Sequence, residues 1–261
     1  MLRATLVKLL ALALVASELA LLDGAARGWG IALTLAATAA FFAWVIVVPS
    51  AQFVVPSVFR LPPAPANEVA FTFDDGPDPE ITPQILALLA RHGAQATFFV
   101  VGSRAEQHPD LVRRILAEGH AVGSHTYSHS NAFHFGSPNR QRDDVERGIT
   151  VVHAITGSAP RLFRPPQGLR TPLLRDALRT HPELVCVTWT ERGLDAMGRQ
   201  APAITRRLTP AVRPGAILTL HDGAGLGGTL DRTPTVEALD ELLALAKRRG
   251  LRCVSLARLV A

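Results

Sequence analysis

The 261-residue sequence has little cysteine, tyrosine or lysine. Its two cysteines are too few for a fold built on disulfides, and Cys186 and Cys253 each lie in an apolar run, which indicates buried free thiols. Only 19% of the residues are charged and 48% are hydrophobic, which excludes a disordered chain. The net charge of +5 comes from arginines interleaved with acids. The sequence therefore indicates no nucleic-acid binding, and we expect no obligate protein partner.

The hydrophobic residues are concentrated at the N-terminus. Of the first 55 residues, 40 are apolar, and no charged residue occurs between Arg27 and Arg60. Residues 29–48 form an apolar stretch of the length that crosses the hydrocarbon of a bilayer. We therefore predict a membrane anchor over residues 1–50, with the lipid bilayer as its partner.

The first part of this anchor, residues 4–22, is less clearly a membrane span. Lys8 and Glu18 interrupt it, and ionic groups are costly at the centre of a bilayer. A first span, an interfacial helix and a signal-peptide-like start all fit, and a hairpin of two helices is favoured. Arg3 and Lys8 favour a cytoplasmic N-terminus, so one span places the remaining chain outside, whereas two spans return it to the inside.

The remaining chain divides into a linker and one α/β unit. Residues 51–67 contain four prolines, which favours an extended linker. From residue 68 to 261, strand patterns alternate with helical patterns, which predicts parallel strands covered by helices. The predicted strands cover 69–75, 96–102, 120–125, 162–166, 184–189, 216–222 and 251–256, and the predicted helices 81–93, 104–119, 140–157, 171–181, 201–212 and 233–250. Seven strands suit a barrel, although an open doubly wound sheet has the same local signature.

Polar residues gather where the predicted strands end. They are Asp74 and Asp75 after the first strand, His125 and His129 after the third, Arg164 in the fourth, Asp195 after the fifth, and His221 and Asp222 at the end of the sixth. The carboxyl ends of parallel strands share one edge of a sheet, so these side chains are expected to line one pocket.

Two of these groups suggest metal chemistry. His125 and His129 are four residues apart and can face the same side of a helical turn, and with one carboxylate they form a site for a divalent cation. Asp74 and Asp75 offer that carboxylate and a neighbour that takes a proton from water. Each group also has a plain alternative, because paired histidines can be structural and Asp-Gly-Pro is a common turn.

Taken together, four motifs resemble the polysaccharide deacetylases, the NodB-homology domains of carbohydrate esterase family 4. The motifs are TFDDGPD at 72–78, SHTYSH at 124–129, RPPQG at 164–168 and LTLHD at 218–222. They occur in the family's order, and the resemblance covers residues 68–261. It implies an incomplete (β/α)7 barrel, preceded here by one or two transmembrane helices.

The resemblance also implies roles for individual residues. The implied ligands of a divalent metal, usually Zn²⁺ and sometimes Co²⁺ or Ni²⁺, are Asp75, His125 and His129. Asp74 would be the general base, and Arg164 would orient it and keep it ionised. His221 would be the acid that protonates the departing amine. The backbone N–H of Gln167 would stabilise the oxyanion, although the family often has an aromatic residue at this position.

The remaining implied assignments are less direct. The family has a further motif, the fourth in chain order, which comes before the last motif at 218–222. Here it is represented only by residues 189–195, in which Asp195 is expected to pair with His221, with Glu191 as the substitute. Leu220 is expected to line a pocket for the acetyl methyl group and Trp189 to form a wall, although both also suit a plain core. His134 is expected on a mobile surface loop, with contact to substrate as the alternative.

These features predict a metal-dependent hydrolase that removes N-acetyl groups from an amino sugar. The expected substrate is a cell-surface or lipid-linked glycan resembling peptidoglycan or chitin. The expected place is the bacterial cytoplasmic membrane, with the catalytic domain on the extracytoplasmic side. An O-acetyl esterase with the same metal site and a catalytically silent, membrane-tethered glycan-binding module are the alternatives.

Overall fold

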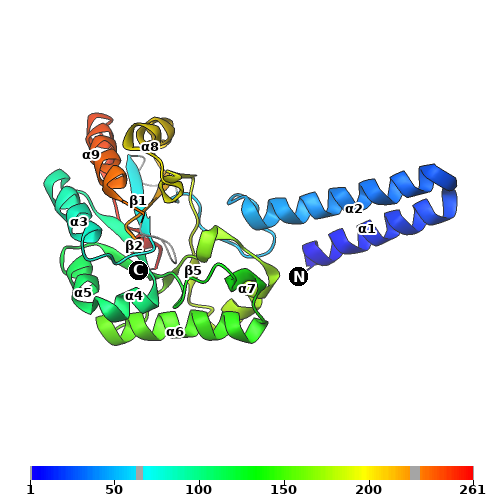
Figure 1. The fold of residues 1–261 in the computed structure, drawn as a ribbon, viewed down its shortest axis with the longest axis horizontal. Coiled ribbons are helices and arrows are strands. Elements are labelled where there is room, and N and C mark those ends of the chain that lie inside the picture. The colour runs from blue at the N-terminus through cyan, green and yellow to red at the C-terminus, as the bar shows by residue number, and fades with distance from the viewer. Residues whose placement is uncertain (1, 63–66, 224–229, 261) are drawn as a thin grey trace.

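A computed structural model describes residues 2–62, 67–223 and 230–260 (Figure 1). The helices are α1 (Leu2–Leu21), α2 (Gly24–Val47), α3 (Ile81–His92), α4 (Gly102–Gln107), α5 (Pro109–Ala117), α6 (Pro138–Thr156), α7 (Pro172–Ala177), α8 (Ala201–Leu208) and α9 (Thr233–Arg248). The strands are β1 (Glu68–Asp74), β2 (Ala96–Val100), β3 (Ala121–Ser124), β4 (Leu162–Phe163), β5 (Val185–Cys186), β6 (Glu191–Arg192), β7 (Ile217–His221) and β8 (Arg252–Cys253).

The strands form one curled parallel sheet. Its order is β5-β4-β3-β2-β1-β7-β6, and β8 pairs with β1. The two outermost strands, β5 and β6, are separated by only a few residues of chain, in which Val187 donates to Phe163 and Thr190 donates to Ile217. One stretch of chain therefore joins both edges of the sheet, which confirms the incomplete (β/α)7 barrel and excludes the open doubly wound sheet.

Alternation along β7 separates an inner from an outer core. Leu218 and Leu220 pack into the cluster that includes the apolar faces of α3, α8 and α9, outside the barrel. Ile217 belongs to the inner cluster with Phe99 and Val187. Because successive strand residues point to opposite faces, Thr219 and His221 point inward as Ile217 does.

Two predicted elements differ in detail. The pattern over residues 104–119 forms two helices, because Pro109 cannot continue α4 and instead occupies the first turn of α5. The short strand β6 was not predicted, since two residues carry no periodic signal. Cys186 is buried as expected, whereas Cys253 is only partly so, and both thiols are free.

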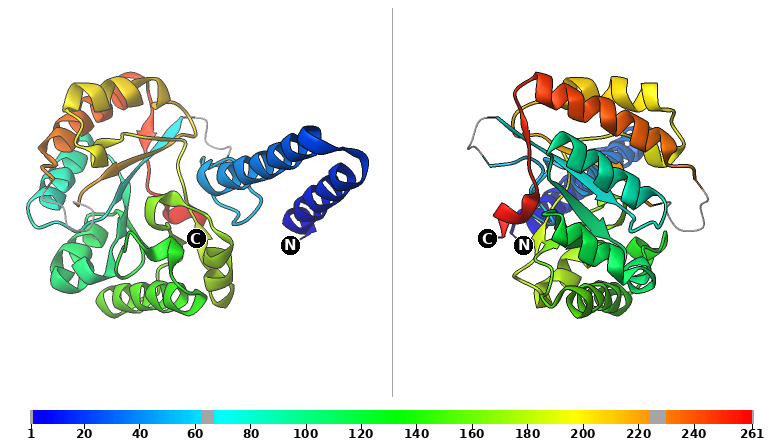
Figure 2. Two further views of the ribbon diagram at one scale, coloured as in Figure 1. Left: turned by 45° about the vertical axis from the view of Figure 1, so that its right-hand side comes forward. Right: turned by 90° about the vertical axis from the view of Figure 1, so that its left-hand side faces the viewer.

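The N-terminal helices α1 and α2 form an antiparallel hairpin that projects from the barrel (Figures 1 and 2). By length and composition, α2 is long and apolar enough to cross a membrane, and α1 contains a shorter apolar run. Exposed large apolar side chains on the hairpin are Leu9, Leu10, Leu12, Leu14, Leu19, Leu21, Trp29, Leu33, Leu35, Trp44 and Val47.

The chain that follows the hairpin packs onto the barrel. Val54, Val55 and Leu61 are buried. Val58 forms a parallel bridge with Val187, and Arg60 forms an antiparallel bridge with Ala216. This part of the segment expected to be a linker is extended and also lies against the sheet; residues 63–66 lie outside the described residues.

Candidate active site

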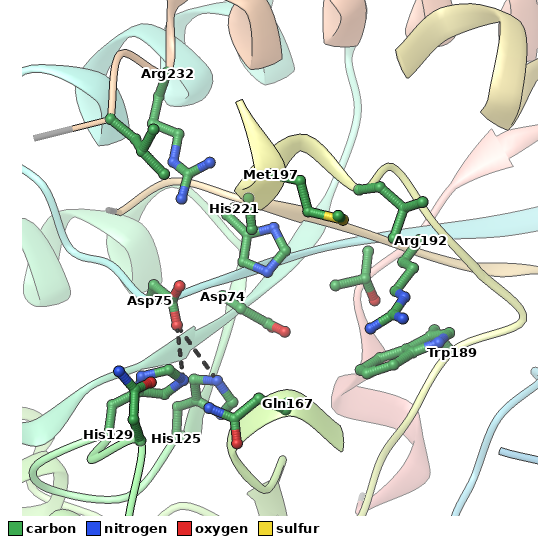
Figure 3. A pocket seen from close by; sticks show the side chains of 15 residues that line it. Asp74, Asp75, His125, His129, Gln167, Trp189, Arg192, Met197, His221 and Arg232 are labelled. Carbon is green, nitrogen blue, oxygen red and sulfur yellow. Dashed lines mark ion pairs between the residues drawn. The ribbon is translucent and has the colours of Figure 1, made fainter. Parts of the chain in front are cut away.

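A cavity of about 300 Å³ opens at the carboxyl ends of the strands (Figure 3). It is lined by Asp74, Asp75, His125, His129, Asn131, Gln167, Trp189, Arg192, Leu194, Ala196, Met197, Thr219, His221, Leu230 and Arg232. The parallel strands thus bring together side chains that are up to 158 positions apart in sequence, from Asp74 to Arg232.

The backbone around this cavity is unusual. Among the described residues, five other than glycine have a positive φ: Asp75, Thr126, His129, Gln167 and Leu194. Four of them line the cavity, and Thr126 lies between the two histidines. Such conformations cost about 1–3 kcal/mol each and cluster at functional sites. The folded protein therefore maintains unfavourable backbone conformations in these loops, and these conformations place the side chains at the cavity.

Asp75, His125 and His129 form a compact, buried cluster of possible metal ligands. The Oδ1 atom of Asp75 lies 3.5 Å from Nε2 of His125 and 3.1 Å from Nε2 of His129. The three ligand atoms lie within 4.8 Å of one another. Two ligands of a cation, each about 2.1 Å from it, are roughly 3.0–3.4 Å apart, so the observed separations fit a shared metal.

The contacts of these ligands also fit a metal. Nδ1 of His125 donates to the backbone carbonyl of Arg164 at 2.6 Å, which leaves the lone pair of Nε2 directed at the cluster. Burial lowers the pKa of His125 to about 4, so the imidazole is neutral and able to coordinate. Oδ1 of Asp75 is buried and accepts no hydrogen bond in the described structure. An unsatisfied buried carboxylate oxygen beside two imidazole nitrogens is a donor set suited to a divalent cation.

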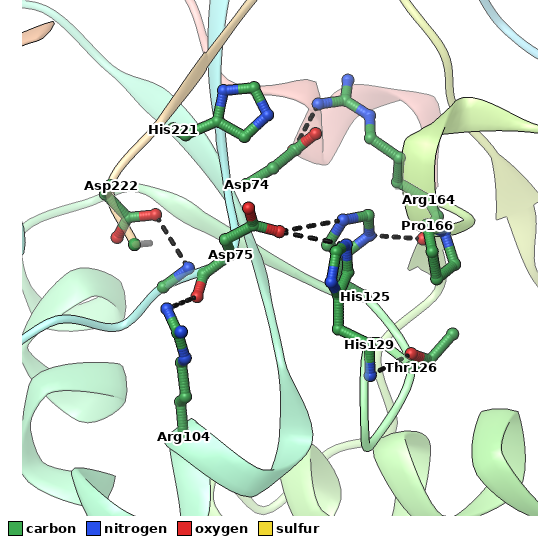
Figure 4. A network of polar contacts seen from close by, with 12 residues as sticks. Asp74, Asp75, Arg104, His125, Thr126, His129, Arg164, Pro166, His221 and Asp222 are labelled. Carbon is green, nitrogen blue, oxygen red and sulfur yellow. Dashed lines mark hydrogen bonds and ion pairs between the residues drawn. The ribbon is translucent and has the colours of Figure 1, made fainter. Parts of the chain in front are cut away.

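The turn that carries Asp75 is held from two sides (Figure 4). The Asp222 carboxylate accepts hydrogen bonds from the Gly76 amide at 3.1 Å and from the Thr82 hydroxyl at 2.7 Å. Nη1 of Arg104 donates to the carbonyl of Asp75 at 2.7 Å. A side chain at Gly76 would overlap the Asp222 carboxylate. Asp222 thus positions the turn that carries Asp75.

Asp74 lies beside the cluster and is paired with Arg164. Nη1 of Arg164 donates to Oδ1 of Asp74 at 2.6 Å and to the Thr72 hydroxyl at 2.8 Å. Nη2 donates to the carbonyl of Thr188 at 2.9 Å. Arg164 is fully buried and its guanidinium is fixed by these bonds, so Asp74 is held in one orientation.

His221 lies on the side of the cavity away from His125 and His129 (Figure 3). The register of β1 and β7 places Asp74 directly beside His221. Nδ1 of His221 lies 2.9 Å from Oδ1 of Asp195, whose Oδ2 accepts from the backbone N–H of His221 at 2.8 Å. Burial alone would lower the pKa of His221, but the Asp195 carboxylate outweighs burial and raises it to about 9. His221 is therefore a cation at neutral pH, with its Nε2 proton free to be donated.

The structure separates the two candidates for the partner of His221. Asp195 makes the contact, whereas Glu191 pairs with Arg207 at 2.5 Å on the surface. Arg232 supports Asp195 by donating from Nη1 to its backbone carbonyl and from Nε to the carbonyl of Gly223, both at 3.0 Å.

Of the remaining residues named from the sequence, some line the cavity and others lie away from it. Gln167 and Trp189 line the cavity, and Trp189 packs so closely over Gly168 that a side chain there would overlap the indole. Leu220 is fully buried in the outer core and does not line the cavity, because its neighbour His221 points inward and strand residues alternate. His134 is also placed wrongly by the sequence, since it is buried and its Nε2 contacts the carbonyl of Pro166 at 2.8 Å.

Sequence reasoning missed several residues of the cavity. Arg192, Met197, Leu230 and Arg232 also line it. Arg104, which fixes the Asp75 turn, was missed as well. Arg192 lies in the 189–195 motif segment but was given no role there, and the others belong to no motif; only folding brings them near the cavity.

Comparisons with known proteins identify the family of this chain. Residues 62–182 match the family model for polysaccharide deacetylase. The chain is 37% identical over 193 residues to a peptidoglycan-N-acetylglucosamine deacetylase of Bacillus cereus, spanning 72% of this chain and 66% of that protein. It is 36% identical to a chitooligosaccharide deacetylase of Bradyrhizobium, spanning 70% of this chain and 86% of that protein. Its fold superposes on the crystal structure of a peptidoglycan N-acetylglucosamine deacetylase with a TM-score of 0.68 at 36% identity, covering 77% of this chain and 90% of that one. The chain therefore belongs to the polysaccharide deacetylase family, with the NodB-homology fold of carbohydrate esterase family 4.

Proposed function

We propose that this protein removes N-acetyl groups from an N-acetylated amino-sugar polymer of the peptidoglycan or chitin type. The single observation that carries this proposal is the meeting of the Asp75 cluster, Asp74 and His221 around one cavity. Relatives named as deacetylases of peptidoglycan and of chitooligosaccharides support the substrate class.

The residues divide the reaction between them. Asp75, His125 and His129 would hold a divalent cation, which supplies Lewis acidity and makes water a better nucleophile. Asp74, oriented by Arg164, takes the proton from the attacking water. The backbone N–H of Gln167 donates to the oxyanion that develops on the substrate carbonyl.

His221 completes the reaction by donating its Nε2 proton to the departing amine nitrogen. The Asp195 carboxylate keeps His221 protonated at neutral pH, as its pKa of about 9 indicates. The amine of an amide substrate leaves only after its nitrogen receives a proton. The alkoxide released from an ester is a better leaving group than an amide anion, so ester cleavage depends less on this proton. The charged His221 therefore favours amide cleavage over ester cleavage.

We propose Zn²⁺ as the metal. Two imidazole nitrogens and one carboxylate oxygen are ligands that zinc accepts readily, leaving positions for water and substrate. Co²⁺ and Ni²⁺ suit the same donors, so metal content measured after expression, followed by reconstitution with each ion, identifies the metal.

We also propose that the hairpin of α1 and α2 anchors the enzyme in the bacterial cytoplasmic membrane, with the catalytic domain on the extracytoplasmic side. Because the two helices are antiparallel, this orientation places both ends of the hairpin on that side, in contrast to the cytoplasmic N-terminus that Arg3 and Lys8 favour. The exposed apolar side chains of the hairpin support this proposal, because such a surface requires an apolar environment. Protease accessibility in spheroplasts tests the sidedness, since degradation of the catalytic domain by external protease is expected only for this orientation.

Acetate release tests the proposed function directly. The detergent-solubilised full chain, loaded with Zn²⁺, is incubated with peptidoglycan, chitooligosaccharides and acetylated xylan. We expect acetate from one or both of the N-acetylated substrates. His125→Ala and Asp75→Asn are expected to lose both bound metal and acetate release, whereas His92→Gln, which removes a surface contact to Asp240, keeps both. Full activity in either cluster variant would refute the site.

A further inference from the structure

The C-terminal end of α2 is joined to the barrel through Arg170. This side chain is fully buried, and within the described residues no carboxylate pairs with it. Its guanidinium donates instead to backbone carbonyls at the end of α2 and in the turn that follows. The acceptors are Ala51 at 2.8 Å, Pro49 at 3.2 Å, Val45 at 3.4 Å and Val48. The backbone N–H of Arg170 donates to Ile46 at 3.2 Å.

The end of a helix is a suitable place for such a buried cation. The last carbonyls of an α-helix lack partners within the helix and carry a partial negative charge. Arg170 satisfies these carbonyls, and they in turn balance its charge. If the end of α2 moved away, Arg170 would be a buried cation without acceptors, so it would have to leave its position.

Arg170 is also close to the active-site loop in sequence. It follows Gly168 by two residues, and the stretch between Arg164 and Arg170 contains Gln167 with its positive φ of 52°. Arg164 fixes one end of this stretch to Asp74. Arg170 fixes the other end to α2, so buried arginines anchor both ends of the loop that carries the Gln167 amide.

Apolar packing ties the same two parts together. Val45, near the end of α2, is buried in a cluster with Phe163, Leu174 and Cys186. Phe163 immediately precedes Arg164, and Leu174 lies in α7, just after Arg170. Figure 1 shows the end of α2 beside this part of the barrel. The hairpin thus shares an apolar cluster with residues that precede and follow the Gln167 loop.

We propose that Arg170 is a positioning residue through which the N-terminal hairpin holds the Gln167 loop in its active geometry. The hairpin is then a working part of the catalytic unit and not only its anchor. This inference rests on the proposed deacetylase function, in which the Gln167 amide stabilises the oxyanion. It predicts that loosening the end of α2 lowers the rate of the chemical step, although the cavity and the metal ligands are untouched.

The test uses the full chain in detergent, loaded with Zn²⁺, with Arg170→Gln and Arg170→Lys as variants. Arg175→Gln is the control, because Arg175 lies on α7 and its guanidinium pairs with the exposed Asp176 instead of with α2. Arg170→Gln is expected to lower kcat on chitooligosaccharides about ten- to a hundredfold with little change in KM or metal content, since a misplaced oxyanion donor acts on the transition state. Arg170→Lys is expected to recover part of the loss, and Arg175→Gln to match the wild type.

Hydrogen exchange followed by mass spectrometry supplies a second readout. Amides of residues 166–170 are expected to exchange faster in Arg170→Gln, while those of β1 and β7 do not change. From the helix side, Val45→Ala is expected to lower kcat in the same direction. Its effect should be smaller in the Arg170→Gln background than in the wild type, because both substitutions disturb one contact.

Wild-type kcat together with unchanged exchange over residues 166–170 in Arg170→Gln would overturn the inference. If that variant does not fold, Arg170→Lys and Val45→Ala decide by the same two measurements. An inactive wild type would refute the proposed function instead, and the exchange experiment would still test whether the hairpin holds the loop.

Discussion

Replacing Asp195 with asparagine is expected to move the alkaline limit of activity to lower pH. The Asp195 carboxylate lies 2.9 Å from Nδ1 of His221 and outweighs the burial that would otherwise lower the pKa of that imidazole. The difference between the ordinary value of 6.5 and about 9 corresponds to about 3 kcal/mol in favour of the charged form. In Asp195→Asn the largest contribution that raises this pKa is lost, while burial and the weaker effects of Asp75 and Asp74 remain, so the pKa of His221 is expected to fall well below 9, toward its ordinary value of 6.5.

The assay is the pH dependence of kcat/KM for acetate release between pH 6 and 10. Wild-type activity is expected to fall as pH rises through about 9, because His221 loses the proton that the amine requires. At pH 8, Asp195→Asn would retain roughly one-thirtieth of the protonated His221 of the wild type if its pKa were 6.5. The conservative variant Glu191→Gln serves as the control, since it removes a carboxylate near in sequence that pairs with Arg207 and accepts from the backbone N–H of Arg192 instead of pairing with His221.

The free energy of unfolding is also expected to fall as pH rises. Because folding raises the pKa of His221, its contribution to the free energy of unfolding is complete below pH 6.5 and is lost as pH rises through about 9. The thermal midpoint of the wild type is therefore expected to decline over this range more steeply than that of Asp195→Asn. An alkaline limb that stays at the wild-type pH in Asp195→Asn would refute the assignment of His221 as the acid.

Three further substitutions test other contacts of the site. Gly76→Ala is expected to push the Asp222 carboxylate away, which destabilises the fold by about 1–3 kcal/mol and weakens metal binding. Thermal unfolding and metal titration measure these two effects, and an unchanged metal affinity would show that Asp222 does not position the Asp75 turn. Arg164→Gln leaves Asp74 buried without its cation, so we expect a loss of about 3–5 kcal/mol in urea unfolding and at least a hundredfold lower kcat, and a variant of normal stability would show that the pair is not needed. His221→Ala is expected to reduce amide cleavage far more than cleavage of an O-acetyl ester, and equal losses on matched substrates would speak against a proton donor.

Much of the fold followed from local pattern. Alternating strand and helix signals placed all seven main strands, because buried parallel strands and amphipathic helices leave a periodic record in sequence. The residues at strand ends followed too: Asp75 and His125 belong to elements whose carboxyl ends must share one edge of a parallel sheet. The break at Pro109 was missed, since the helical pattern continues across it.

Only the tertiary structure decided how those residues act on one another. The choice of Asp195 over Glu191 depends on how the chain between β6 and α8 folds back over β7, which no local pattern encodes. Leu220 was expected at the cavity, but the inward direction of His221 on the same strand forces it into the outer core.

The sequence by itself determined that an apolar N-terminus precedes a catalytic α/β unit, because composition and periodicity are local properties. It could not reveal that the two parts are joined at Arg170. That contact is made by backbone carbonyls of residues 45–51, and a backbone carbonyl has the same chemistry at every position of a sequence. Only the folded chain shows which carbonyls are left unpaired at the end of α2 and which buried cation reaches them.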